Sequence, residues 1–315
     1  MSFVEIPENP VPPNAVVGFL TTSDGVRLRF ARFPTTAPSR GTVILLQGRA
    51  EFIEKYFETA VDLGERGFSV VAFDFRGQGR SERRLRNRRK GHVDDFGEYL
   101  LDVQALMREI VLPDCPGPFY LLGHSMGAPV ALAAARARPL WFERVVLTAP
   151  LFGLPLRAEE GVRLLAASLD SLGLGAAYIP GGGSRVIHLA PFSGNPLTSD
   201  PARYERTAAL LRAGPDLALG APTIAWVHAA FRAMRQVCAP EFLAGLTVPV
   251  LAIAAGAERI VDNRPIERFG HAVRAGGVVT IPNARHEILM ERDMFRDLFW
   301  AGFDAFVPGG ERMAA

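Results

Sequence analysis

One short segment of this 315-residue chain combines a nucleophile with the backbone that such a nucleophile needs. Residues 121–128 read LLGHSMGA and match the pattern G-x-S-x-G, between an apolar run and an alanine-rich helical run. Glycines two residues before and after Ser125 permit a sharp turn from strand to helix that exposes the hydroxyl above a sheet edge. The helix N-terminus beside it supplies N–H groups for a developing negative charge. We predict that Ser125 is the nucleophile of an acyl transfer; the alternative is a glycine-rich packing turn.

A serine hydroxyl needs a base to take its proton, and the base needs an acid to orient it. Where the serine lies on such a turn, the chain order is serine, acid, histidine. His286 lies in a loop after the last predicted strand, so we predict that it is the general base; a loop histidine of structural role is the alternative. Of the remaining histidines after the serine, His188 and His228 precede any acid at a strand end, so they do not fit this order. His271 lies in a helical stretch, where a surface or packing role is expected.

Two carboxylates compete for the role of the orienting acid. Both follow the predicted strand Val250–Ala255 in the segment GAERIVD. Glu258 is closer to the strand end, so we predict that it is the acid, with Asp262 as the alternative. Either side chain could instead be a solvated loop carboxylate.

The elements that must position these residues follow an alternating pattern. Strand-like runs are predicted at residues 16–21, 26–33, 42–46, 68–74, 119–122, 142–148, 250–255 and 278–281, and helices at 55–66, 96–111 and 127–138. The first two strands flank Ser23-Asp24-Gly25, a hairpin turn signal. Strands that alternate with helices indicate an α/β fold with a mostly parallel central sheet and flanking helices.

One segment breaks this alternation. Between Pro150 and Pro249 the pattern is helical only, at residues 157–172, 201–212 and 222–238, with glycine- and proline-rich joints. We therefore expect a core of residues 1–150 and 245–315 and a helical cap, or lid, of residues 151–244. The apolar residues Val227, Ala230, Phe231 and Met234 recur at helical spacing there, which fits either core packing or the lining of an acyl pocket.

The composition excludes several classes of protein. A formal net charge of +2 gives no overall attraction to nucleic acid. With only Cys115 and Cys238, free thiols in a cytoplasmic protein are expected. The start of the chain lacks a signal-peptide pattern, and no apolar run approaches the roughly 20 residues of a membrane span. No zinc spacing, phosphate loop or dinucleotide fingerprint occurs, so we expect no metal and no cofactor.

Four blocks of sequence resemble the lysophospholipase and monoacylglycerol lipase branch of the α/β-hydrolases. They are QGRAEFIEKY at 47–56, DFRGQGRS at 74–81, the turn around Ser125, and PNARHE at 282–287. Residues 195–200 and 258–263 look particularly like the bacterial lysophospholipases. The resemblance implies the α/β-hydrolase fold, hydrolysis of a lysophospholipid or monoacylglycerol ester, and an oxyanion hole made by the backbone N–H groups of Arg49 and Met126.

The chain departs from that family at two positions. Gln47 replaces the usual histidine, and Glu258 stands where the family generally has aspartate. The first is expected only to help hold the turn, because the oxyanion hole uses backbone groups. The second keeps its function, because glutamate also serves as a triad acid.

A basic segment follows the strand that ends near residue 74. It contains Arg76, Arg80, Arg83, Arg84, Arg86, Arg88, Arg89 and Lys90 with one acid, Glu82. A solvated loop is the usual meaning of such a run. The alternative is a rim that contacts an anionic surface at the inner face of the membrane.

Three other functions stay open. A short-chain carboxylesterase shares every motif. An aminopeptidase of the same fold would need acids in the cap to hold an amine, and Glu159, Glu160 and Asp170 are available. A ligand-binding or membrane-surface module that retains a triad without turnover is the third.

Overall fold

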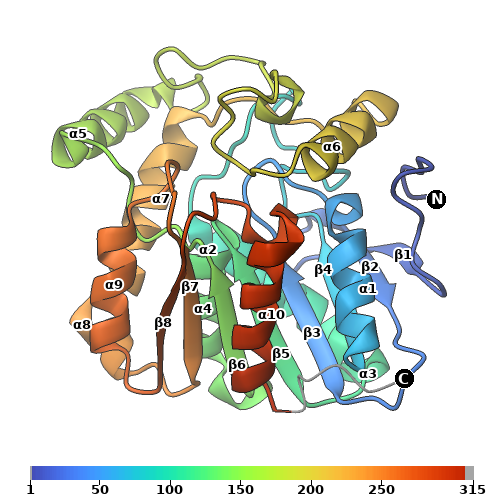
Figure 1. The fold of residues 1–315 in the computed structure, drawn as a ribbon. Coiled ribbons are helices and arrows are strands. Elements are labelled where there is room, and N and C mark those ends of the chain that lie inside the picture. The colour runs from blue at the N-terminus through green and yellow to red at the C-terminus, as the bar shows by residue number, and fades with distance from the viewer. Residues whose placement is uncertain (1, 309–315) are drawn as a thin grey trace.

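The central element is an eight-stranded sheet, which a computed structural model describes within residues 2–308 (Figure 1). Its strand order is β1-β2-β4-β3-β5-β6-β7-β8. The strands are β1 (Val16–Thr21), β2 (Arg27–Phe33), β3 (Gly41–Leu46), β4 (Phe68–Phe73), β5 (Phe119–His124), β6 (Arg144–Thr148), β7 (Val250–Ala255) and β8 (Gly276–Ile281). Only β2 pairs antiparallel with its neighbours, and all other pairs are parallel. The predicted α/β architecture with a mostly parallel sheet is therefore confirmed.

Local sequence explains the turn between β1 and β2 and the two apolar faces of β3. In the first hairpin Gly25 adopts φ 86°, a conformation that glycine reaches without strain. In β3 successive side chains point to opposite faces. Ile44 and Leu46 pack in one apolar layer, while Val43 and Leu45 pack in the other. Because both faces are buried, the strand reads as a continuous apolar run.

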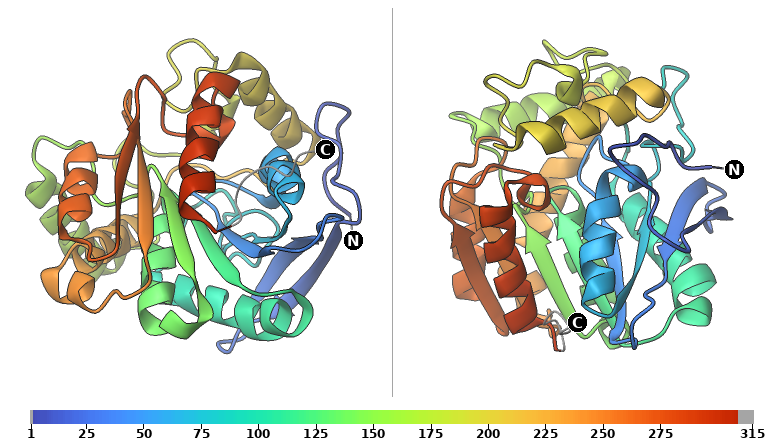
Figure 2. Two further views of the ribbon diagram at one scale, coloured as in Figure 1. Left: turned by 60° about the horizontal axis from the view of Figure 1, so that its bottom comes forward. Right: turned by 45° about the vertical axis from the view of Figure 1, so that its right-hand side comes forward.

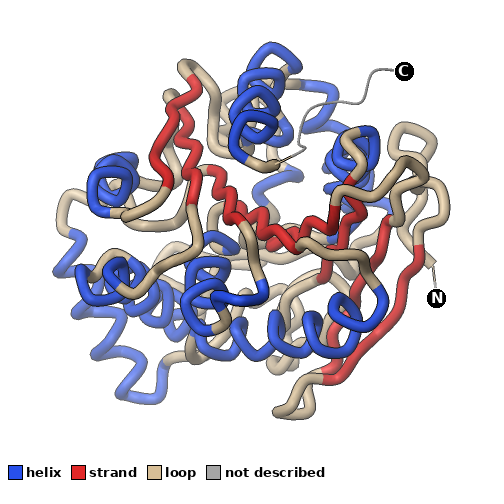
Figure 3. The backbone as a smooth tube through the Cα atoms, turned by 90° about the horizontal axis from the view of Figure 1, so that it is seen from below, coloured by secondary structure: helices blue, strands red, loops and turns tan. Residues whose placement is uncertain are grey.

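Helices cover both faces of the sheet (Figure 3). On one face lie α1 (Phe57–Glu65) and α10 (Asp293–Phe306), whose aromatic side chains pack against the strands. On the other lie α2 (Phe96–Leu106), α4 (Gly127–Ala137) and α9 (Asn263–Ala272). A capping box begins α2, with Asp95 as the N-cap and Glu98 as its partner. The helix predicted over 96–111 continues beyond α2 as the π-helical η2 (Met107–Val111) and the short α3 (Leu112–Asp114).

The chain between β6 and β7 contains helices and loops but no named strand. Its helices are α5 (Glu159–Leu169), η4 (Asp170–Leu174), η5 (Ile187–Leu189), α6 (Pro201–Ala213), α7 (Ile224–Val237) and α8 (Pro240–Ala244). The three helices predicted here are present as α5, α6 and α7. Helices α5 and α6 lie above the carboxyl ends of the strands, whereas α7 descends beside α2 and α4 (Figures 1 and 2). The indole N–H of Trp226 in α7 donates to the Tyr99 hydroxyl of α2 at 3.1 Å.

The sheet reverses its winding between β3 and β5. The connection after β3 leads to β4 on one side, and β5 then lies on the other side of β3. Loops after the carboxyl ends of such strands diverge and leave a crevice, which is where α/β proteins bind ligands. No helix among residues 2–308 combines the length and apolar composition that crossing a membrane requires.

Candidate active site

Ser125 lies on the turn between β5 and α4, in a backbone conformation that non-glycine residues rarely adopt. Its φ is 49°, and its N–H donates to the Thr148 carbonyl at 3.0 Å. The flanking glycines are required by close approach rather than by φ. A Cβ on Gly127 would lie 2.1 Å from the Leu46 carbonyl oxygen, and one on Gly123 would lie 3.0 Å from the carbonyl oxygen of Gly127. The strained turn raises the hydroxyl above the sheet edge.

His286 lies against this hydroxyl. Its Nε2 atom is 3.0 Å from Ser125 Oγ, and its Nδ1 atom is 2.8 Å from Glu258 Oε2. The three side chains come from the loops after β5, β7 and β8, whose carboxyl ends share one edge of the sheet. This chain of contacts is the arrangement that lets an imidazole remove a hydroxyl proton while a carboxylate orients the ring.

The side chains of the two competing carboxylates, Glu258 and Asp262, point to different partners. The other carboxylate oxygen of Glu258 accepts the backbone N–H groups of Arg259, Ile260 and Val261. Burial alone would raise the pKa of Glu258. The hydrogen bond to His286, the charge of His286 and the backbone donors together lower this pKa overall. Asp262 instead caps α9 by accepting the N–H of Arg264 at 3.0 Å and pairs with the guanidinium of that residue at 2.7 Å. The structure therefore brings Glu258, and not Asp262, to the histidine.

The loop after β3 is held by residues whose role the sequence did not reveal. The side-chain amide of Gln78 donates to the Gly48 carbonyl at 3.0 Å and accepts the Ala50 N–H at 2.8 Å. The Glu51 carboxylate accepts the Gly48 N–H at 2.5 Å. In the described part of the chain, neither polar atom of the Gln47 side chain has a hydrogen-bond partner. The Gln47 side chain therefore does not hold this turn by hydrogen bonds; Gln78 and Glu51 do so.

Arg49 and Met126 lie beside the serine. Both residues line the same hollow as Ser125, and neither N–H donates to another group within residues 2–308. Ala50, which follows Arg49, has φ 65°, so this loop is strained like the serine turn. Two free N–H groups beside a nucleophile are suited to a tetrahedral oxyanion.

A fully buried polar cluster supports this loop from behind. Lys55 Nζ lies 2.6 Å from Glu51 Oε1 and 2.7 Å from Glu287 Oε1. His188 Nε2, from η5, lies 2.8 Å from the same Glu287 oxygen. Burial would lower the pKa of Lys55, but the two carboxylates raise it overall. Thus His188, which the chain order excluded as the base, connects the segment between β6 and β7 to the residue after His286.

His124 completes the surroundings of the histidine. Its ring lies 5.0 Å from that of His286, and its Nδ1 atom is 3.0 Å from Thr148 Oγ1. Burial lowers the pKa of His124 to about 4, and the positive charges of His286 and Lys55 act in the same direction against Glu51. Near neutral pH the ring is therefore uncharged.

Beside Ser125 a hollow of about 530 Å³ opens beneath α5. Besides Arg49, Ser125 and Met126, its lining is apolar: Leu151, Leu154, Leu156, Val162, Leu165, Ala166, Leu169, Ile179, Pro180, Pro222, Ile224, Trp226, Val227, Ala230 and Ile260. Of the four apolar residues of α7 singled out above, Val227 and Ala230 line this hollow. Phe231 and Met234 lie in the core beneath a separate hollow between α5, α7 and α9. The helix thus contributes side chains both to the core and to the hollow beside Ser125.

The other residues singled out from sequence lie outside this hollow. His228 Nδ1 is 2.8 Å from Asp170 Oδ2, and Glu160 pairs with Arg163. His271 is exposed at the end of α9. Both cysteines are free. Within residues 2–308 no group of three or more His, Cys, Asp or Glu side chains is arranged to hold a metal ion.

The basic segment divides into two parts. Arg76 is buried against Asp24, Glu98 and Asp102. Arg83 is 9% exposed and donates to five backbone carbonyls, those of Gly79, Arg88, Asp216, Leu217 and Ala218. Arginines held in this way neither face a membrane nor lie in a solvated loop, so both interpretations of the segment are wrong for Arg76 and Arg83. The exposed cations are Arg84, Arg86 and Arg88, with Arg89 and Lys90 half-buried.

Comparison with known proteins identifies relatives over most of the chain. Residues 37–293 match the model of the family described as "Serine aminopeptidase, S33". The chain is 35% identical to lysophospholipase L2 of Escherichia coli over 294 residues, which cover 88% of this chain and 83% of that protein. It is 29% identical to human monoglyceride lipase, over 78% of this chain and 74% of the relative.

Solved structures share the fold. A soluble variant of monoglyceride lipase from Saccharomyces cerevisiae, bound to a substrate analogue, superposes with a TM-score of 0.75 at 18% identity and covers 94% of this chain and 97% of its own. The monoacylglycerol lipase of Paleococcus ferrophilus gives a TM-score of 0.71 at 22% identity and covers 90% of this chain and 99% of its own. At such identities the likeness concerns the fold alone.

Proposed function

Because this chain belongs to the α/β-hydrolase family of the serine aminopeptidases, with lysophospholipases and monoglyceride lipases among its relatives, we propose that it is a serine hydrolase of single-chain lipid esters. The observation that carries the proposal is the hydrogen-bonded chain Ser125–His286–Glu258, which opens onto an apolar hollow. A lysophospholipid or a monoacylglycerol supplies the ester and one acyl chain of suitable polarity.

In the proposed reaction Ser125 Oγ attacks the ester carbonyl carbon while His286 Nε2 takes its proton. The N–H groups of Arg49 and Met126 bind the oxyanion of the tetrahedral intermediate. The C–O bond to the glycerol part then breaks, and His286 returns the proton to the departing alkoxide. Water attacks the acyl-enzyme with the same histidine as base, which releases the fatty acid and regenerates the serine. No cofactor is needed for these steps.

The apolar lining of this hollow favours an acyl chain over the charged amine of a peptide. An aminopeptidase would need a carboxylate near the scissile bond, yet no Asp or Glu is among the described residues that line this hollow. Of the acids considered for that role, Asp170 contacts His228 and Glu160 pairs with Arg163. The third, Glu159, lines the separate hollow between α5, α7 and α9. A short-chain carboxylesterase remains the second candidate, because the same hollow accepts a shorter chain.

We also propose that residues 151–244 form a cap over a core of residues 1–150 and 245–315. In this segment α5 and η4 expose several leucines, with Leu164 and Leu165 each 52% exposed and Leu172 75% exposed. Lys90 of the basic segment donates to the Ala176 carbonyl at 2.6 Å, which places that segment beside η4. Exposed leucines in this segment, together with the exposed cations Arg86 and Arg88, suit peripheral contact with an anionic lipid surface.

Hydrolysis assays with p-nitrophenyl esters of increasing chain length, lysophosphatidylcholine, a monoacylglycerol and an aminoacyl anilide test the proposal. We expect a burst of nitrophenol followed by steady turnover, cleavage of a single-chain lipid, and no cleavage of the anilide. A binding module would show no steady turnover. Preferential cleavage of the anilide would identify a peptidase instead.

A further inference from the structure

The side chain of Arg49 has no function in the mechanism above, which uses only its backbone N–H. It is nevertheless the only charged residue among the described residues that line the hollow beside Ser125. An apolar side chain at this position would present the same N–H to an oxyanion. Oxyanion binding therefore does not account for the guanidinium at this position.

Arg49 has few partners within the protein. Its Nη1 atom donates to the Gly220 carbonyl at 2.8 Å, and its Cζ atom lies 5.7 Å from the centre of the Trp226 ring. No carboxylate of residues 2–308 forms an ion pair with it. Since a guanidinium is a planar fork of several N–H donors, most of its donors are left for another group.

Other arginines removed from solvent are compensated. Arg29 pairs with Glu54 and Asp74, and Arg203 pairs with Glu58, Asp200 and Asp293. Arg83, which has no carboxylate partner, is surrounded by carbonyl oxygens instead. Among these four arginines, Arg49 alone contacts a single carbonyl group and lines an apolar hollow.

This arrangement has an electrostatic cost. Burial lowers the pKa of Arg49 to about 10, against a small opposing effect of Tyr99. The group still carries its charge at neutral pH, so a half-buried positive charge lies beside an apolar hollow without a carboxylate partner. An anion that enters the hollow would supply the missing partner.

We propose that the Arg49 guanidinium binds the phosphate of the substrate headgroup and makes the enzyme selective for phosphate-bearing single-chain lipids over neutral monoacylglycerols. Arginine matches phosphate oxygens in paired, charge-assisted hydrogen bonds. The same residue would bind the ester oxyanion through its backbone and the headgroup through its side chain. In a lysophospholipid acylated at the terminal carbon, the number of bonds from the ester oxygen to phosphorus equals that from an arginine Cα to its Cζ.

The proposal rests on the ester hydrolysis assigned to Ser125, so the test compares two substrates of the same enzyme. A monoacyl glycerol phosphate and a monoacylglycerol with the same acyl chain are assayed with wild type, Arg49→Gln and Arg49→Lys. We expect wild type to favour the phosphate lipid in kcat/KM, and Arg49→Gln to lower the ratio of the two values by about 10- to 100-fold, as for a hydrogen bond to a charged group. Arg49→Lys should restore part of the ratio, because it keeps the charge but not the fork.

Arg108→Gln is the matched control, because Arg108 is exposed in η2, at the end of α2 away from the hollow. It should leave the ratio unchanged. A ratio in Arg49→Gln within threefold of wild type overturns the headgroup role while the hydrolase assignment stands. If wild type cleaves neither lipid, the proposed function fails, and the headgroup role fails with it.

If the Arg49 variants misfold, an inhibition measurement on the wild-type protein still tests the proposal. A single-chain alkyl phosphate should inhibit p-nitrophenyl ester hydrolysis at least tenfold more strongly than the alcohol of the same chain, and inorganic phosphate should not inhibit at the same concentration. Equal inhibition by the alkyl phosphate and the alcohol overturns the proposal. Equal inhibition by inorganic phosphate assigns the site to the free anion and overturns the lipid headgroup.

Discussion

The Nε2 atom of His286 lies 3.0 Å from the Oγ atom of Ser125, although 161 positions separate the two residues in the chain. Neither residue could hold the other in place by itself. The loops that carry them end β8 and β5, and the parallel sheet brings both loops to one edge. The geometry of this contact is thus a property of the sheet.

Replacing either residue should abolish ester hydrolysis. We expect Ser125→Ala and His286→Ala each to lower kcat by at least about 10⁴-fold, and the double variant to lose little more, because the residues act as a unit. Steady-state assays with a p-nitrophenyl ester measure this, and thermal denaturation checks that the fold is kept. More than a tenth of wild-type turnover in Ser125→Ala would refute the nucleophile assignment.

The two carboxylates after β7 should differ sharply in their effects. Glu258→Gln should lower kcat by about 10⁴-fold, because an amide cannot stabilise the charged imidazole and favours the wrong tautomer. Asp262→Asn should cost less than tenfold, since Asp262 caps α9 away from His286. A larger loss in Asp262→Asn than in Glu258→Gln would reverse the assignment.

Gln78 should affect turnover without touching substrate. Gln78→Ala removes the two hydrogen bonds that the Gln78 side chain makes to the Gly48–Ala50 segment, so the Arg49 N–H should lose its fixed direction. We expect kcat to fall about tenfold to a hundredfold, less than for loss of an oxyanion donor itself, with little change in KM. Gln236→Ala, at an exposed position of α7, serves as the control. Unchanged kcat in Gln78→Ala would mean that Glu51 suffices.

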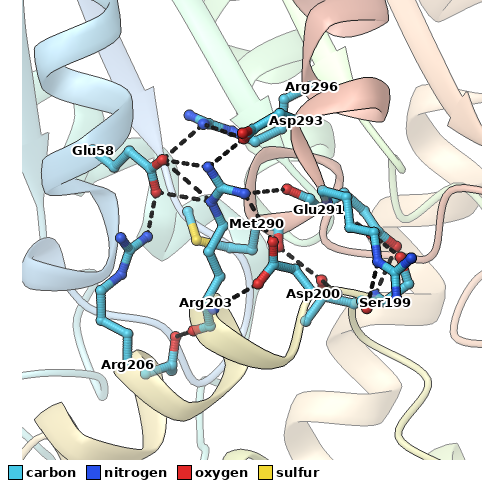
Figure 4. A network of polar contacts seen from close by, with 12 residues as sticks. Glu58, Ser199, Asp200, Arg203, Arg206, Met290, Glu291, Asp293 and Arg296 are labelled. Carbon is cyan, nitrogen blue, oxygen red and sulfur yellow. Dashed lines mark hydrogen bonds and ion pairs between the residues drawn. The ribbon is translucent and has the colours of Figure 1, made fainter. Parts of the chain in front are cut away.

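Glu58 joins α6 to the core, and its removal should destabilise the protein in a pH-dependent way (Figure 4). Its carboxylate pairs with Arg203, Arg206 and Arg296, from α6 and α10. Burial would raise the pKa of Glu58, but the three arginines lower it to about 2. Since the folded pKa lies below the ordinary value of 4.5, this stabilisation is complete above that pH and is lost as the pH falls toward 2.

Glu58→Gln should therefore lower the free energy of unfolding by about 2 kcal/mol at pH 7, since it leaves three partly buried arginines short of a partner. Urea unfolding between pH 7 and pH 3 measures the difference from wild type, which should shrink at the acidic end. Glu109→Gln, at an exposed site on η2, should have no such effect. A difference that does not vary with pH would exclude the ionised carboxylate as its source.

The exposed half of the basic segment should govern binding to anionic vesicles. Replacing Arg86, Arg88 and Arg89 with glutamine should weaken binding by up to about 1 kcal/mol per charge at low salt. The loss should diminish as salt rises, because exposed charges are screened over about 8 Å at physiological ionic strength. Co-sedimentation at two salt concentrations decides the matter. Equal binding of variant and wild type at low salt would mark these arginines as a solvated surface only.

Local sequence patterns were sufficient to predict much of the secondary structure of this protein. The strand and helix runs, the hairpin turn and the serine turn depend on short-range periodicity and on glycines within a few residues, so the sequence determined them. His286 was also found, because chain order along a parallel sheet restricts which loops can meet. The α/β fold followed from the alternation of strands and helices for the same reason.

Only the tertiary structure decided where individual side chains point and what surrounds them. Glu258 and Asp262 lie in one loop with equal chemistry, and the direction of each side chain separates them. Arg83 and Arg86 are alike in sequence, yet one is surrounded by carbonyls of distant segments and the other by solvent. Likewise Arg49 faces an apolar hollow without a carboxylate partner. Burial and pairing of charges depend on residues far apart in the chain, and such contacts have no signature in local sequence.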